Sequence, residues 1–126
     1  MISASRFLIA ALFCAFLFGC GDKKVEDQTQ LKIPADSLIA EDKMVLILAD
    51  VHVIEADLLQ ERSKGIDTKG KQGFYYQGLF KKFRISNSRY EQNLSFYRQN
   101  PENFSKMYER VVTLLEDRQK SITGQK

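Results

Sequence analysis

The chain has 126 residues and a slight basic excess, with 19 Lys and Arg against 16 Asp and Glu. This balance argues against a nucleic-acid partner, which requires a basic stripe on one face. Fewer than 100 residues are expected to be ordered, so the chain has room for one domain with a modest core.

The first segment is an apolar run, residues 7–18, that follows a single basic residue, Arg6. A short basic region, an apolar region and a processing site form the layout of a secretory signal. The run is shorter than the roughly 20 apolar residues that span a bilayer, and it lacks the polar face expected of a core helix. We therefore predict a signal peptide over residues 1–19.

The segment ends in Leu17-Phe18-Gly19-Cys20, which resembles a bacterial lipobox. The cysteine is required there because its thiolate accepts a diacylglyceryl group. Phe18 departs from the pattern, since a small residue is usual at that position. Ordinary secretion and an uncleaved anchor are the alternatives, although Leu17 stands where an ordinary signal peptidase requires a small residue. Two or more acyl chains on Cys20 would anchor the protein stably.

Residues 20–32 are polar and charged, which predicts a lipidated cysteine followed by a flexible tether. After removal of residues 1–19, Cys20 would be the only cysteine, so we expect neither a disulfide nor a thiol nucleophile. We expect a single helical domain over residues 33–120 and a frayed tail at 121–126.

The domain is predicted to begin with a long helix over residues 39–62, capped by Asp36 or Ser37. Asp42, Asp50 and Asp57 are predicted on its polar side. A loop with two glycines follows at residues 63–70, and then a second, aromatic helix at residues 72–83. The predicted apolar face of the first helix consists of Met44, Ile47, Leu48, Val51, Ile54, Leu58 and Leu59.

Two further helices are expected. Ser88 and Glu91 form a capping-box pattern that predicts the start of a helix ending near Gln99. Asn100 and Pro101 then form a strong start signal, with Asn as N-cap and Pro at the first helical position. No convincing strand pattern is present. The predicted fold is all-α, a small bundle of about four helices in which two longer terminal helices enclose two short aromatic ones.

The resemblance to a family rests on the order and spacing of several short motifs. These are Ile33-Pro34, residues 48–56, Phe83-Arg84-Ile85-Ser86, Tyr90, residues 94–97, Asn100-Pro101-Glu102, Met107-Tyr108, Val111 and Leu115. Over about residues 33–116 the chain resembles the Bacteroidota lipoprotein family called domain of unknown function 4296. The resemblance implies a Gram-negative envelope lipoprotein and brings no activity, catalytic residue or cofactor.

His52 and Glu55 are the first candidate functional pair, because residues three apart on a helix are neighbours. Glu55 is predicted near the middle of the apolar face, where a carboxylate with a perturbed pKa could act in acid–base chemistry or in a metal site. A zinc site needs about three protein ligands, however, and His52 is the only histidine. The alternative is that Glu55 hydrogen-bonds a Tyr or Arg from a packed helix.

Other candidates are three tyrosines and one serine. Tyr75, Tyr76 and Tyr97 could form a binding face, since tyrosine favours surfaces with one wet edge; the alternative is a core filled with rings. Ser37 lies in Asp36-Ser37-Leu38, which matches a short sequon that is O-glycosylated in exported proteins of that phylum. Ser37 could equally cap a helix.

No Gly-rich phosphate loop, nucleophile elbow or catalytic carboxylate pair is found in the sequence. We expect a non-enzymatic protein with no cofactor and no metal. It would be lipid-anchored in the cell envelope and would bind or assemble with another envelope protein. The alternatives are an enzyme or enzyme accessory that uses Glu55 and His52, and a small-ligand or glycan binder that uses exposed tyrosines.

The substitution Cys20→Ser tests the lipobox. We expect it to abolish incorporation of labelled palmitate and to move the protein out of the membrane fraction, because the hydroxyl does not replace the thiolate as acyl acceptor. A variant that still incorporates palmitate would contradict the assignment.

Overall fold

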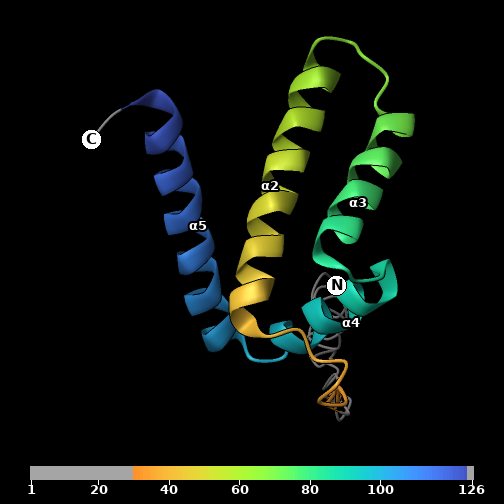
Figure 1. Ribbon diagram of the computed structural model, residues 1–126, viewed down its shortest axis with the longest axis vertical. Coiled ribbons are helices and arrows are strands. Elements are labelled where there is room, and N and C mark those ends of the chain that lie inside the picture. Colours follow the sequence, from red (N-terminus) through yellow and green to blue (C-terminus); the bar gives the residue numbers. More distant parts are fainter. Residues whose placement is uncertain (1–29, 125–126) are drawn as a thin grey trace, which may run out of the picture.

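A computed structural model describes residues 30–124 and contains four helices in that range (Figure 1). They are α2 (Glu41–Ser63), α3 (Lys69–Phe83), α4 (Asn87–Arg98) and α5 (Pro101–Thr123). No strand occurs among the described residues, so the all-α prediction is confirmed. The predicted signal peptide, Cys20 and most of the predicted tether lie outside the described residues.

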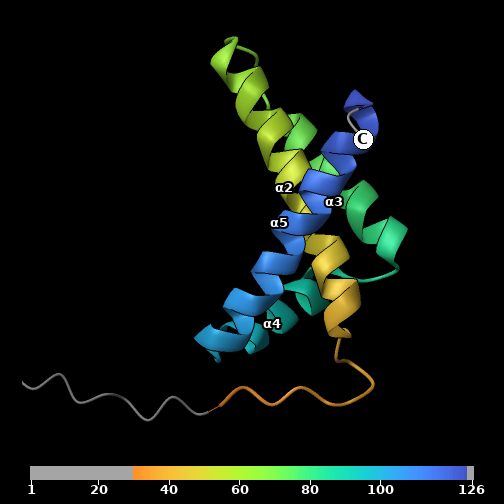
Figure 2. The same ribbon diagram turned by 90° about the vertical axis from the view of Figure 1, so that its left-hand side faces the viewer.

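The helices are arranged around α2. In Figure 1, α2 lies between α5 and α3, and it packs against both of them. The short helix α4 lies at the end of the bundle where α2 begins and packs against α5 (Figure 2). The described chain before α2 also runs along this end, so the start of the domain and the connection from α4 to α5 are neighbours.

Of the four described helices, α4 and α5 begin at a residue whose side chain caps the helix. Asn100 caps α5 as predicted, and its side chain accepts a hydrogen bond from the backbone N–H of Asn103 at 3.0 Å. The cap of α4 is Ser86 rather than the predicted Ser88, since the Ser86 hydroxyl accepts from the Arg89 N–H at 3.1 Å. The prediction was wrong because the chain re-enters helical conformation at Asn87, before Ser88 could act as cap.

The prediction that Asp36 or Ser37 caps α2 is also wrong. The N-cap is Ala40, which makes no side-chain hydrogen bond to the helix. The backbone N–H groups of Ser37 and Leu38 instead donate to the Pro34 carbonyl at 2.9 and 3.0 Å, which closes a separate turn. Two further bounds differ from expectation: α3 begins at Lys69, and α5 continues to Thr123, where Gly124 adopts a left-handed conformation (φ 67°).

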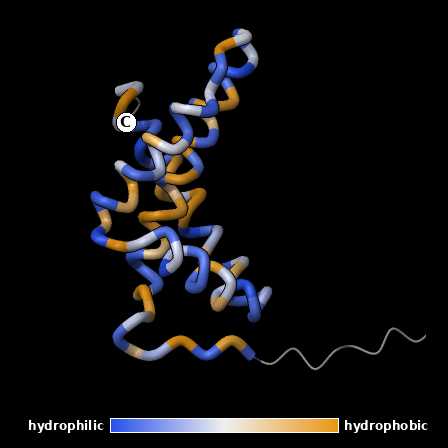
Figure 3. The backbone as a smooth tube through the Cα atoms, turned by 90° about the vertical axis from the view of Figure 1, so that its right-hand side faces the viewer, coloured by the Kyte–Doolittle hydropathy of each residue, from blue (hydrophilic) through white to orange (hydrophobic). Residues whose placement is uncertain are grey.

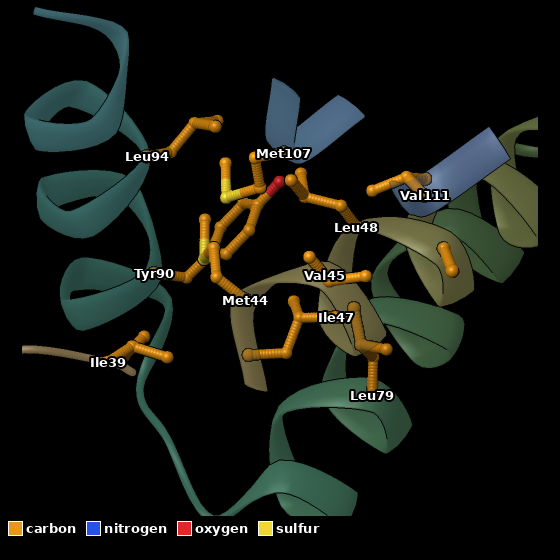
Figure 4. Close-up of a cluster of buried hydrophobic side chains, with 11 residues drawn as sticks. Ile39, Met44, Val45, Ile47, Leu48, Leu79, Tyr90, Leu94, Met107 and Val111 are labelled. Carbon is orange, nitrogen blue, oxygen red and sulfur yellow. The ribbon is translucent and has the colours of Figure 1, made fainter. Parts of the chain in front are cut away.

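The hydrophobic core lies between α2 and the other three helices (Figure 4), and the apolar positions gather along the middle of the bundle (Figure 3). One helix, α2, contributes almost half of it. Leu59, which was predicted on the apolar face of α2, is 65% exposed, whereas its neighbour Leu58 is fully buried, because successive helical residues turn by about 100° and Leu59 lies outside the buried side. The buried cluster consists of Ile39, Met44, Val45, Ile47, Leu48, Ala49, Leu79, Tyr90, Leu94, Met107 and Val111.

A buried amide on α4 holds the chain that precedes α2. Asn93 is completely buried, and its side-chain oxygen accepts from the Ile39 N–H at 2.7 Å. Its NH2 group donates to the carbonyls of Ser37 and Arg89 at 3.1 and 2.8 Å. The Tyr97 hydroxyl donates to the Ile39 carbonyl at 2.6 Å. The backbone just before α2 is therefore bonded to α4 at several points.

A second attachment lies eight residues earlier. The Gln99 side-chain oxygen accepts from the Leu31 N–H at 2.5 Å, and its NH2 group donates to the Leu31 carbonyl at 3.1 Å. One side-chain amide thus satisfies both polar groups of a single backbone residue. Residues 31–39 are consequently fixed to α4 at both ends.

The substitution Asn93→Ala tests this attachment. We expect it to lower the free energy of unfolding by about 2–3 kcal/mol, because the buried Ile39 N–H loses the acceptor that Asn93 provides. Urea denaturation measures the change. Asn103→Ala, at an exposed position, is the control and should change the free energy by less than about 0.5 kcal/mol. If both variants changed the free energy of unfolding by the same small amount, the proposed attachment of residues before α2 by Asn93 would be contradicted.

Candidate binding groove

His52 and Glu55 make hydrogen bonds to different helices. His52 Nε2 and the Tyr108 hydroxyl of α5 are 3.2 Å apart, and the two rings meet edge to face. The Tyr76 hydroxyl of α3 donates to Glu55 Oε1 at 2.5 Å. No hydrogen bond joins His52 to Glu55 in the described part of the chain. Each side chain therefore serves as a contact between α2 and one neighbouring helix.

The contact between Tyr76 and Glu55 contributes to a shift in the pKa of Tyr76. Burial, and then the hydrogen bond to the Glu55 carboxylate, raise the pKa of Tyr76 well above its ordinary value. The Arg62 guanidinium lies 3.9 Å from the other Glu55 oxygen. Among residues 30–124, no group of three or more His, Cys, Asp or Glu side chains is arranged to hold a metal ion. Glu55 thus has a tyrosine and an arginine as partners.

The three tyrosines of the predicted binding face differ in their hydrogen bonds and surroundings. Tyr76 and Tyr97 both direct their hydroxyls to groups within the domain, the Glu55 carboxylate and the Ile39 carbonyl. Burial raises the pKa of Tyr97, with a smaller contribution from the charge of Glu41. Tyr75 is half-buried, and its ring lies 6.2 Å from that of Phe74.

Ser37 lies in the turn before α2. Its hydroxyl donates to Asp36 Oδ1 at 3.3 Å, and its carbonyl accepts from Arg89 Nε at 3.0 Å and from the Asn93 amide. The predicted lipidation site, Cys20, lies outside the described residues. The Leu31 region also borders a cavity of about 640 Å³ at the corner between α4 and α5.

Asp50, which was predicted on the polar side of α2, contacts both of the helices that flank α2. Its side chain is only 14% exposed, and its carboxylate bonds Lys82 of α3 at 2.6 Å and Arg118 of α5 at 2.8 Å. Both cations come from distant parts of the chain, so the pattern of α2 alone did not indicate these ion pairs. One carboxylate on α2 therefore connects the two helices that flank it.

An apolar groove runs along the open side of α2, and we call it the α2 groove. It consists of two shallow cavities of about 450 and 300 Å³ on successive turns of α2 and α5. Leu46 and Val53, two turns apart on α2, are 41% and 52% exposed within it. The first cavity is lined by Asp42, Val45, Leu46, Arg110, Thr113, Leu114 and Asp117. The second is lined by Asp50, Val53, Ile54, Gly78, Leu79, Lys82 and Arg118.

The α2 groove lies on a side of α2 that faces the space between α5 and α3, and its lining comes from these three helices. Apolar side chains therefore remain partly exposed along this side of α2, and charged residues lie beside them. Two residues in the sequence indicate this exposed surface. Leu46 and Val53 are apolar, yet they lie on the side of the predicted helix that carries Asp42, Asp50 and Asp57.

The fold and this surface define a small all-α domain with an open apolar groove. None of the helices in residues 30–124 is long and apolar enough to cross a bilayer. The chain belongs to the family described as Domain of unknown function (DUF4296), which matches residues 35–121. The predicted membership of domain of unknown function 4296 is thereby confirmed, and the envelope lipoprotein context that the resemblance implies stays a prediction. Comparisons with curated proteins and with solved structures found no match.

The buried tyrosines predict how stability depends on pH. Burial, and then the charge of Glu91, raise the pKa of Tyr90 to about 12, above the value of about 10 in an unfolded chain. The stabilising contribution is complete below pH 10 and is lost as the pH rises toward 12, because the unfolded chain releases the proton first. We expect the free energy of unfolding to fall more steeply above pH 10 in the wild type than in Tyr90→Phe.

Urea denaturation at pH 8, 10 and 11 measures this difference. Lysine deprotonation affects both proteins and cancels in the comparison. Parallel pH profiles for the wild type and Tyr90→Phe would contradict the assigned pKa of Tyr90.

Proposed function

We propose that this protein is a lipid-anchored module of the cell envelope that binds another envelope protein through the α2 groove. The lipid on Cys20 holds it on a membrane, in the outer membrane of a Gram-negative bacterium, with the helical domain facing the periplasm or the outside. In this proposal the protein performs no catalysis and concentrates its partner at the membrane surface.

The observation that carries the proposal is the exposure of Leu46 and Val53 along one open side of α2. Leaving such side chains in water forgoes stabilisation of about 25 cal/mol per Å² of apolar area that a partner could bury. Charged side chains beside Val53 are already paired, since Lys82 and Arg118 both bond the Asp50 carboxylate. A partner that packs on Val53 therefore meets ion-paired groups there.

The anchor and the groove are compatible in space. The chain that leads back toward Cys20 leaves the domain at the end where α4 lies (Figure 2), beside Gln99. The α2 groove runs along the side of the bundle, from near the start of α2 to its middle. A partner on the same membrane could approach this side without displacing residues 31–39 from α4.

The substitution Val53→Asp tests the groove, with Val112→Asp as a matched control. The two valines are equally exposed, at 52% and 51%. Val112 is two residues from Leu114 and therefore faces the other side of α5, since successive helical residues turn by about 100°. Neither substitution should change the free energy of unfolding by more than about 0.5 kcal/mol.

Affinity capture from native membranes, quantified by mass spectrometry, is the measurement. We expect Val53→Asp to reduce recovery of the partner at least tenfold, because it places a charge against the apolar surface of the partner. Val112→Asp should recover the partner at wild-type yield. Equal recovery by both variants would contradict the use of the α2 groove.

A further inference from the structure

The walls of the α2 groove restrict what kind of backbone can bind there. Each wall is the side of a helix, whose backbone groups are hydrogen-bonded internally. A partner strand would find no strand edge with which to pair at this surface. A bound segment must therefore satisfy its own backbone groups, and an amphipathic helix does this while presenting apolar side chains.

The dimensions of the α2 groove suit a short helix. From Asp42 to Ile54 the groove extends about 18 Å along α2, which is the length of about 12 helical residues. Gly78 forms part of the α3 wall, and a Cβ added there would meet no atom within 4 Å. This open space lets the backbone of a neighbouring helix approach closely.

The two ends of the α2 groove carry opposite charge. At the end near the start of α2, two carboxylates, those of Glu41 and Asp42, share the guanidinium of Arg110. At the other end two cations, Lys82 and Arg118, share one carboxylate. The first end therefore carries an excess negative charge and the second an excess positive charge.

This order of charges orients a bound helix. The N-terminus of a helix carries a partial positive charge and its C-terminus a partial negative charge. The N-terminus of the partner helix is therefore favoured near Asp42, and its C-terminus near Lys82. Because α2 runs from Asp42 toward the level of Lys82, the partner helix would lie parallel to α2.

We propose that the α2 groove binds one amphipathic helix of about three turns from a partner protein, parallel to α2. One of its apolar residues lies on Leu46, another lies two turns later on Val53, and an acidic residue near its C-terminal end lies beside Lys82. The proposal rests on the proposed function, because both use the same groove. A second copy of this chain is a less suitable occupant of the α2 groove. Its corresponding face is also a groove, so it offers no protruding helix to fill the first one.

Photocrosslinking of the full-length protein in its native membranes tests this proposal. A diazirine amino acid is placed at Leu46, at Val53 or, as control, at Val112, and mass spectrometry locates the crosslinked residues. The two groove positions are about 10.5 Å apart along α2. We expect adducts about seven residues apart on one partner protein, with the Leu46 adduct first and an acidic residue within one turn of the Val53 adduct.

Other results would overturn the proposal in distinguishable ways. Adducts only about three residues apart would indicate an extended strand, and the reverse order would indicate an antiparallel helix. Either result rejects the proposed parallel helix but leaves the groove as a binding surface. Adducts to a second copy of this chain reject a partner helix in favour of self-association. Groove yields no higher than the Val112 yield reject both the helix and the proposed function.

Discussion

The architecture depends on one constraint: a single helix, α2, has to provide the packing surface for all the others. Five of its residues lie in the buried cluster, and α3 and α5 reach the core by packing on two of its sides. The short α4 covers α2 only near its start (Figure 2). A chain of this length has no further helix among its described residues to cover the remaining side. The core and the α2 groove are therefore two consequences of the same arrangement.

Two polar contacts stabilise an arrangement that apolar packing alone would leave loosely specified. The Asp50 carboxylate bonds cations from α3 and α5, which sets both helices relative to α2. The buried Asn93 amide bonds the backbone just before α2, which sets the start of α2 relative to α4. Buried polar groups are costly when unpaired, so each contact favours one arrangement of helices over its alternatives. In the proposed function, the Asn93 contact also joins the anchored chain to the folded domain.

Sequence periodicity predicted the all-α fold, because the spacing of apolar residues reflects which side of a helix is buried. It failed at Leu59, which lies at the edge of the predicted apolar face and is exposed although the neighbouring Leu58 is buried. Asn93 and Asp50 could not be predicted as partners, because the groups they bond lie 54 and up to 68 residues away. The groove follows from the packing of three helices, although Leu46 and Val53 on a polar side were a visible signal. The roles of Glu55 and His52 could not be predicted either, because they depend on which tyrosines of the neighbouring helices contact them.

The central claim is that the open side of α2 is covered by a partner in the native membrane. Thiol labelling at Val53→Cys measures this directly, because Cys20 would be acylated and Cys14 removed with the predicted signal peptide. We expect maleimide to label Val53→Cys slowly in native membranes and rapidly after purification in detergent, whereas Val112→Cys should be labelled rapidly in both. Equal and rapid labelling of the two positions in native membranes would contradict the claim.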